Sequence, residues 1–150
     1  MQYSSGDFDR TSRTIQYQKS EASLIHEQVL ESGVRDEFSK ERHHKVAVVE
    51  LPSKTISLTI GELEPLQITN MHRHNYETIL YIAEGQGYTI VENLKIPWRA
   101  GDAVYVPVWA WHQHGNLSST KKATYLACEN APLLQNLGNI ALREEFKKGE

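Results

Sequence analysis

The chain has 150 residues, which is the size of one domain built around a single core. Its formal net charge of -3 gives no electrostatic reason to expect nucleic acid or anionic membranes as partners, because phosphate binding normally leaves a basic footprint. No apolar run approaches the roughly 18 residues that a membrane span needs, and the first residues lack the charged-then-apolar order of a secretory signal. A cytoplasmic protein without a membrane segment is expected.

Residues 1–45 are predicted to form an N-terminal arm and a short helix. Residues 1–18 are polar and show no apolar period, which favours a loose arm. Ser20 can cap a helix over about residues 21–31, because apolar side chains fall on one side of that segment and Ser32-Gly33 can end it.

Residues 46–130 consist of short runs rich in Val, Ile, Thr and Tyr, separated by turn residues. Such runs at nearly even spacing predict an all-β sandwich or barrel of antiparallel strands. The runs cover residues 46–51, 55–60, 66–71, 78–83, 88–91, 103–106 and 123–128, and the turns include residues 84–87 and 115–116. The single cysteine, Cys128, lies among apolar neighbours and is expected to be a buried small hydrophobic residue.

Residues 131–150 are predicted to form a C-terminal helical tail. Apolar side chains recur there at helix-like intervals and precede a solvated Glu/Lys run, although Gly138 weakens the helical pattern. The apolar residues are Leu133, Leu134, Leu137, Ile140 and Ala141. No internal repeat or interdomain linker is visible, so one barrel with short flanking helices is expected.

Two histidine pairs have the spacing of metal ligands. Alternate side chains of a strand project from one face, so His72 and His74 would point toward one place. His112 and His114 form a second pair, which lies after Pro107 and two tryptophans. One such pair is weak evidence, because a β-strand can carry two histidines for other reasons. Two pairs in separate β segments favour a metal site.

Imidazole is a borderline ligand that suits iron, zinc, nickel and copper. Neutral histidine donors leave the charge of the metal undiminished, and three of them leave coordination positions open for substrate and water. The other histidines, His26, His43 and His44, are expected at the surface or as helix caps. Trp109 and Trp111 are expected to pack in the core or at its rim, and Arg73 and Gln113 to point away from the ligand face.

The two pairs lie in a pattern that resembles the cupin superfamily, a group of small β-barrels. The second cupin motif, G-x5-P-x-G-x2-H-x3-N, is matched by Gly101, Pro107, His112 and Asn116, with Trp109 at the usual glycine. The first motif, G-x5-H-x-H-x3,4-E-x6-G, is matched by His72, His74 and Gly85, with Leu66 at the leading glycine and Thr78 at the glutamate. The resemblance covers about residues 51–138 and implies a cupin double-stranded β-helix, a jelly-roll barrel.

The glutamate of the first motif has no direct counterpart. Glu77 lies one residue early, and a shift of one residue turns a strand side chain to the opposite face unless a bulge intervenes. The resemblance therefore implies a three-histidine site made by His72, His74 and His112, without Glu77.

Within the superfamily, the chain resembles gentisate and salicylate 1,2-dioxygenases in residues 72–74, 84–87 and 107–116. This resemblance implies one Fe(II) per chain on three histidines, with zinc, manganese and nickel as alternatives. It also implies that His114 faces the substrate as a catalytic residue that does not bind the metal. The arginine that helps those enzymes to bind the substrate carboxylate falls on Leu80 here, which argues against gentisate itself as the substrate.

Three functions are compatible with these residues. The first is a mononuclear non-haem Fe(II) dioxygenase-like enzyme for a small aromatic or dicarbonyl acid, in which His114 orients the substrate or carries protons. The second is a non-redox isomerase, cyclase or lyase that uses the metal as a Lewis acid. The third is a small-ligand binding or sensor module without catalysis. A homodimer is expected in each case, because an open sheet edge needs covering and cupins commonly pair.

Overall fold

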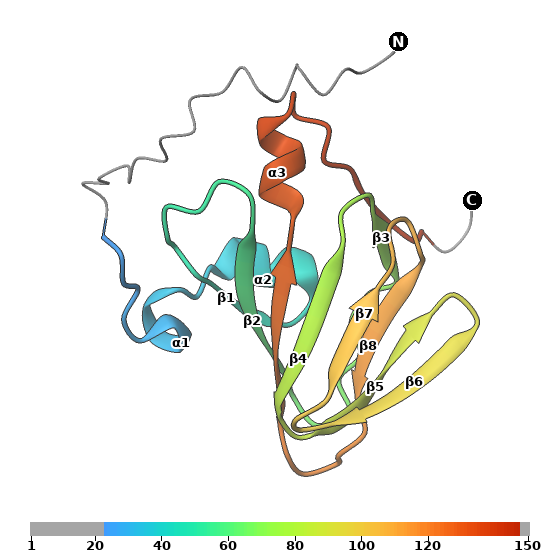
Figure 1. Ribbon diagram of the computed structural model, residues 1–150. Coiled ribbons are helices and arrows are strands. Elements are labelled where there is room, and N and C mark those ends of the chain that lie inside the picture. Colours follow the sequence, from blue (N-terminus) through green and yellow to red (C-terminus); the bar gives the residue numbers. More distant parts are fainter. Residues whose placement is uncertain (1–22, 148–150) are drawn as a thin grey trace.

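The computed structural model describes residues 23–147 and shows two five-stranded antiparallel sheets that enclose one core (Figure 1). The first sheet contains, in spatial order, β1 (Lys45–Val48), β2 (Ser57–Leu63), β9 (Ala123–Glu129), β4 (Thr78–Glu84) and β7 (Ala103–Val106). The second contains β10 (Arg143–Glu145), β3 (His72–His74), β8 (His112–Asn116), β5 (Gln86–Val91) and β6 (Leu94–Arg99). This architecture confirms the all-β, two-sheet barrel that the sequence predicts.

Three short helices flank the sheets: α1 (Val29–Ser32), α2 (Asp36–Arg42) and α3 (Ala131–Asn136). Figure 1 shows α1 and α2 on one side of the molecule and the β5–β6 hairpin on the other. Both N-terminal helices contact β1. They therefore lie against the outermost strand of the first sheet.

Side-chain alternation along the strands builds the core. In β4, Thr78, Leu80 and Ile82 are buried, whereas Ile79 and Tyr81 between them are exposed. The other strands contribute in the same way, because alternate strand residues face opposite sides of a sheet. The resulting apolar cluster consists of Leu63, Leu80, Ile82, Trp98, Val104, Val106, Ala123, Tyr125 and Ala127.

The N-terminal region differs from its prediction. Residues 1–22 lie outside the described part of the chain, and residues 23–28 are not helical, so the helix predicted over 21–31 is reduced to α1. The sequence does not predict α2. Asp36 and Glu37 lie in its first turn and Lys40 and Arg42 in its last, which complements the helix dipole, although Glu41 also lies in the last turn. The helix ends at His43, whose φ of 57° is left-handed.

Several predicted strands and turns differ from the structure. Residues 66–71, predicted as a strand, form only an isolated bridge at Ile68, and Gly115 and Asn116, predicted as a turn, belong to β8. The sequence does not predict β6, because Pro97 and charged residues interrupt its apolar pattern. The predicted tail helix stops at Asn136, and β10 follows it as the outer strand beside β3.

Two positions that hold glycine in the cupin motifs keep a glycine-like backbone here. Leu66 has a φ of 60° and Trp109 a φ of 63°. Both values lie in the left-handed region, which costs a non-glycine residue about 1–2 kcal/mol. Both residues therefore adopt a backbone conformation that glycine would adopt without this cost.

The prediction that Cys128 is buried is wrong, because this cysteine is exposed. Tyr125 and Ala127 face the core, and alternation turns Cys128 to the outer side of β9. Apolar neighbours in the sequence do not reveal which face of a strand a residue occupies. Within residues 23–147, no helix is long and apolar enough to cross a membrane.

Candidate metal centre

Three histidines meet on the inner face of the second sheet. His72 and His112 are direct partners across the antiparallel β3–β8 pair, so their side chains leave the sheet on the same face. His74 shares this face because it lies two residues after His72 in β3. The three rings offer nitrogen atoms that all lie within 4.8 Å of one another. Such a group could hold one metal ion.

Backbone carbonyl groups fix the orientation of these rings. The Nδ1 atoms of His72, His74 and His112 lie 2.9, 2.8 and 2.8 Å from the carbonyl oxygens of Asn70, Tyr76 and Ala110. A carbonyl can only accept, so each Nδ1 must donate its proton. The Nε2 atom of each neutral ring therefore keeps its lone pair for a metal.

Burial favours the neutral form of the three rings. It lowers the pKa of His74 to about 4, with the charge of His112 as the next cause. Burial likewise lowers the pKa of His112 to about 4 and lowers that of His72 further. Neutral imidazole is the form that binds metals, so the site is prepared for a cation near neutral pH.

His114 faces the same cavity but has a different hydrogen-bond partner. Its Nδ1 lies 2.9 Å from Oγ1 of Thr89, and that hydroxyl oxygen accepts a bond of 3.0 Å from Nε1 of Trp98. The buried Thr89 hydroxyl must place its own proton, and His114 Nδ1 is its one acceptor among the described residues. In this arrangement Thr89 donates to Nδ1 and the neutral ring carries its proton on Nε2. His114 then presents a hydrogen-bond donor, and not a lone pair, to the cavity.

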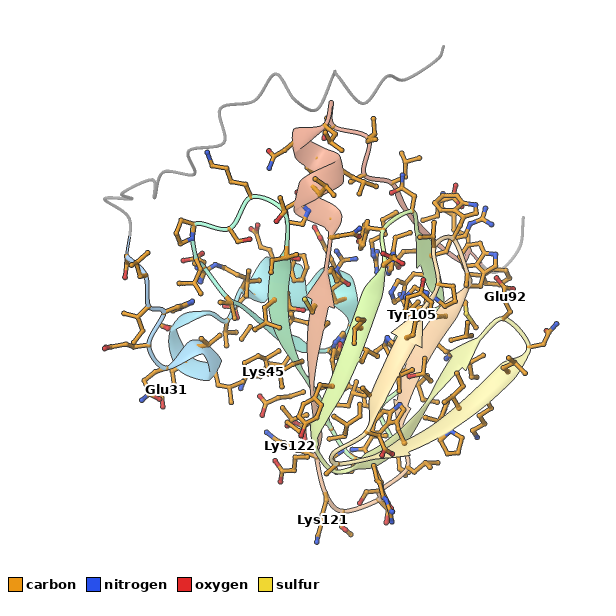
Figure 2. The ribbon with its side chains drawn as sticks, viewed as in Figure 1. Glu31, Lys45, Glu92, Tyr105, Lys121 and Lys122 are labelled. Atoms are coloured by element: carbon orange, nitrogen blue, oxygen red, sulfur yellow. The ribbon has the colours of Figure 1, made fainter. Side chains whose placement is uncertain are left out.

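Two carboxylates lie near the position of the motif's glutamate, and they face opposite sides of the first sheet. Glu77 is exposed on the outer side, where it accepts a bond of 2.9 Å from the hydroxyl of Tyr105, labelled in Figure 2. Thr78 is buried and donates to Oε1 of Glu129 at 3.0 Å. Glu129 is its direct neighbour on β9 and lines the cavity. The nearest inward-facing carboxylate therefore comes from another strand, which sequence reasoning missed.

The histidines form one wall of a small, partly open cavity, in which the centre of a water molecule can move through about 70 Å³. Other lining residues that the sequence did not reveal are Arg42, His44, Tyr125, Glu129 and Arg143, while Leu80 contributes an apolar surface. The inward alternation of Tyr125, Ala127 and Glu129 along β9 is a signal that could have revealed the glutamate.

The expectation that His44 lies at the surface or caps a helix is wrong. This histidine is buried, its Nδ1 lies 2.8 Å from the carbonyl oxygen of Arg42, and its Nε2 lies 2.5 Å from the hydroxyl of Tyr125. His43, in contrast, is exposed at the C-terminal cap of α2. The two neighbouring histidines therefore differ completely in environment.

Arg73 points away from the ligands, as the sequence predicts. Arg73 lies over the rings of Trp109 and Trp111, at 4.4 and 4.5 Å from their centres, and pairs with Glu144 at 2.8 Å. This cation–π cluster covers the outer side of β3. It holds the strand that carries two of the histidines.

Comparisons with known proteins agree with this geometry. Residues 59–128 match the family described as Cupin domain. The chain is 32% identical over 84 residues to 5-aminosalicylate 1,2-dioxygenase of Comamonas sp. and 31% identical over 84 residues to gentisate 1,2-dioxygenase of Streptomyces sp.. These matches cover 56% and 55% of the chain but 22% and 23% of the relatives, so the chain spans less than a quarter of their length.

Solved structures share the fold. Salicylate 1,2-dioxygenase from Pseudaminobacter salicylatoxidans superposes with a TM-score of 0.63 at 20% identity, over 70% of this chain and 32% of that one. A cupin 2 domain-containing protein from Halorhodospira halophila gives a TM-score of 0.54 at 18% identity, over 57% of this chain and 62% of its own. At these identities the likeness concerns the fold alone.

Proposed function

We propose that the protein is a mononuclear non-haem Fe(II) dioxygenase-like enzyme, because residues 59–128 match the Cupin domain family, the sequence is similar to gentisate 1,2-dioxygenase, and the fold is similar to that of salicylate 1,2-dioxygenase. Its substrate would be a small aromatic or dicarbonyl acid. The observation that carries the proposal is the convergence of three histidine nitrogens within 4.8 Å on the wall of a cavity. Ferrous iron on these donors would supply O2 chemistry, which protein side chains lack.

The chain's own residues would position and enclose the substrate. His72, His74 and His112 would hold the metal through Nε2, since their Nδ1 protons are bonded to carbonyl groups. His114 would act as the catalytic residue that does not bind the metal. Its Nε2 proton can hydrogen-bond an oxygen of the substrate and orient it. Leu80 and Ala127 supply apolar walls, which strengthen polar interactions by excluding water.

Oxygen uptake after anaerobic loading with Fe(II) tests this function. We expect one iron per chain and O2 consumption with at least one phenolic acid or 1,3-dicarbonyl compound. His112→Ala should lose both iron and activity, whereas His114→Gln should keep iron and lose activity. Gln113→Ala is the matched control, because it changes the same strand on the opposite face.

The other outcomes distinguish the alternative functions. Turnover that persists with zinc in place of iron would indicate a non-redox isomerase, cyclase or lyase, because zinc has no redox chemistry. Bound metal without O2 uptake or turnover of any tested compound would contradict the enzyme proposal and leave a ligand-binding or sensor role. Unchanged metal content in His72→Ala and His112→Ala would remove the proposed centre.

We further propose that the protein is a cytoplasmic homodimer. The outer face of the first sheet exposes large apolar side chains at Ile79, Tyr81 and Tyr105, which are 55%, 50% and 50% exposed. Ile79 and Tyr105 are direct partners across β4 and β7, so these side chains form one patch. Sedimentation velocity should report a dimer for the native chain and a monomer for Tyr81→Lys. A monomeric native protein would contradict the proposal.

A further inference from the structure

Two arginines line the cavity, and both come from outside the matched cupin region. Arg42 is the last residue of α2, and Arg143 is the first residue of β10. They share the cavity with the three histidines. The segments before and after the central barrel therefore bring two positive charges to the candidate metal centre.

Strand register explains the position of Arg143. It is the direct partner of His74 across the antiparallel β10–β3 pair, so the two side chains leave the sheet on the same face. The next residue, Glu144, points to the opposite face and pairs there with Arg73. Arg143 Nη1 donates to Oε1 of Glu145 at 2.6 Å, which is an ion pair. A guanidinium has five N–H donors, so this bond leaves others available to a ligand.

Arg42 lacks a carboxylate partner among the described residues. Its guanidinium lies over the ring of Phe38, 4.5 Å from the ring centre, and belongs to none of the ion pairs within residues 23–147. Burial, and then the like charge of Arg143, lower the pKa of Arg42. Two partly buried guanidinium groups that repel each other favour an anion between them.

Arg143 is already paired with Glu145, and Glu129 is the carboxylate that could otherwise neutralise Arg42. It lines the same cavity, but its Oε1 accepts from Thr78, and it forms no ion pair with Arg42 or Arg143 within the described residues. The cavity thus contains guanidinium donors in excess of the carboxylates that engage them. The addition of a divalent metal would increase this positive charge.

We propose that Arg42 and Arg143 together bind the carboxylate group of a small acid, whose other oxygen atoms face the three histidines. This inference rests on the proposed function, because it names the substrate-binding residues of the same site. Guanidinium groups bind carboxylates through short, charge-assisted hydrogen bonds that are often bidentate. The two arginines would therefore select acids over neutral compounds of the same shape.

Calorimetric titration with matched acids and amides tests the proposal. Benzoate and salicylate, with benzamide and salicylamide as neutral counterparts, would be titrated into the full chain incubated with zinc. We expect the native protein to prefer the acids by about tenfold or more, equivalent to about 1.4 kcal/mol. Arg42→Gln and Arg143→Gln should abolish most of this preference and leave amide binding unchanged. Arg99→Gln, on the exposed side of β6, should keep it.

Lysine variants separate the effect of the positive charge from that of the planar guanidinium group. Arg42→Lys and Arg143→Lys keep the charge without the planar fork, so they should retain part of the acid preference. They also carry the test if circular dichroism shows that a Gln variant fails to fold. An acid preference that is absent, or equal in the native protein and the arginine variants, would overturn the proposal.

Zinc content, measured in the same samples, distinguishes this proposal from the proposed function. Bound zinc without an arginine-dependent acid preference would remove the carboxylate site and leave the metal centre standing. An arginine-dependent preference in protein that binds no zinc would support the carboxylate site and contradict the metal-dependent function.

Discussion

His112 and His114 lie two residues apart on one strand and face one cavity, yet their hydrogen bonds give them different chemistry. Nδ1 of His112 meets a carbonyl oxygen, and Nδ1 of His114 meets the hydroxyl of Thr89. The spacing of the pair predicts that both rings share a face. It cannot predict the tautomer, because Thr89 belongs to a different strand and Trp98 to a third.

Thr89 should therefore control the tautomer of His114. Nitrogen-15 NMR of histidine-labelled, metal-free protein should show His114 protonated at Nε2 in the native chain and in Thr89→Ser, which keeps the hydroxyl. In Thr89→Val, Nδ1 loses its donor and the Nδ1-protonated form should become populated. We also expect a loss of about 1–3 kcal/mol in stability, since the buried indole N–H of Trp98 loses its acceptor.

The outcome that contradicts this assignment is a native His114 protonated at Nδ1. An unchanged tautomer in Thr89→Val would equally show that the hydroxyl does not decide it. Thr120→Val, on an exposed turn, is a control that should alter neither the spectrum nor the stability.

Glu129 should make stability depend on pH. Burial raises its pKa, against opposing contributions from Thr78, Arg42 and Arg143. The folded protein thus holds this proton more tightly than the unfolded chain, so stability falls as pH rises from the unfolded pKa through the folded one. Glu129→Gln cannot ionise and can still accept from Thr78.

We accordingly expect Glu129→Gln to be more stable than the native protein near pH 7 by more than about 0.5 kcal/mol, the usual range of neutral substitutions. Near pH 4 the side chain at position 129 is neutral in both folded proteins, so the difference in stability should vanish. Urea unfolding at both pH values measures it, with exposed Glu84→Gln as the control. A difference that is independent of pH would contradict the raised pKa.

At the scale of elements, the strands with alternating β-branched residues could be predicted, but β10 could not. Arg143, Glu144 and Glu145 carry no apolar pattern, and their strand forms because β3 offers a free edge. The same limit applies to α2, which rests against β1. Whether such elements form depends on contact partners that lie far apart in the sequence. Both cavity arginines lie on them, so the sequence revealed the histidines and missed the arginines.

Asn75 should hold β10 in place. Its side-chain amide donates to the carbonyl oxygen of Ile140 at 2.7 Å and accepts from the backbone N–H of Leu142 at 2.8 Å. Asn75→Ala removes both bonds and should cost about 1–3 kcal/mol, at roughly 0.5–1.5 kcal/mol for each bond. Hydrogen exchange measured by mass spectrometry should become faster over residues 142–146.

Asn93→Ala is the matched control, because Asn93 is exposed in the turn between β5 and β6 and makes no side-chain hydrogen bond within the described residues. Equal exchange rates over residues 142–146 in Asn75→Ala and the native chain would show that backbone pairing alone holds the strand.

At the scale of the whole molecule, the apolar core and the candidate metal centre adjoin each other, because Leu80, Tyr125 and Ala127 belong to the core cluster and also line the cavity. None of the histidines belongs to the core cluster, which is built from aliphatic and aromatic side chains of both sheets. The sequence could predict this barrel because strand periodicity sets its core. It could predict the histidines of the cavity but not that Arg42 and Arg143, from two distant segments, line the same cavity.

Because the core cluster contains none of the three candidate ligands, metal removal should weaken the protein without unfolding it. Chelator-treated protein should keep its far-UV circular dichroism and unfold cooperatively. Zinc at about 100 times its Kd should then stabilise the fold by about 2.7 kcal/mol. For a domain of this length that corresponds to roughly 5–10 °C in Tm, at about 2–4 °C per kcal/mol. Because the shift requires convergent Nε2 lone pairs, His72→Ala and His112→Ala should abolish it and Gln113→Ala should keep it. Loss of the fold on chelation would contradict the prediction that the core is stable without metal, and an equal shift in His112→Ala would place the stabilising ion elsewhere.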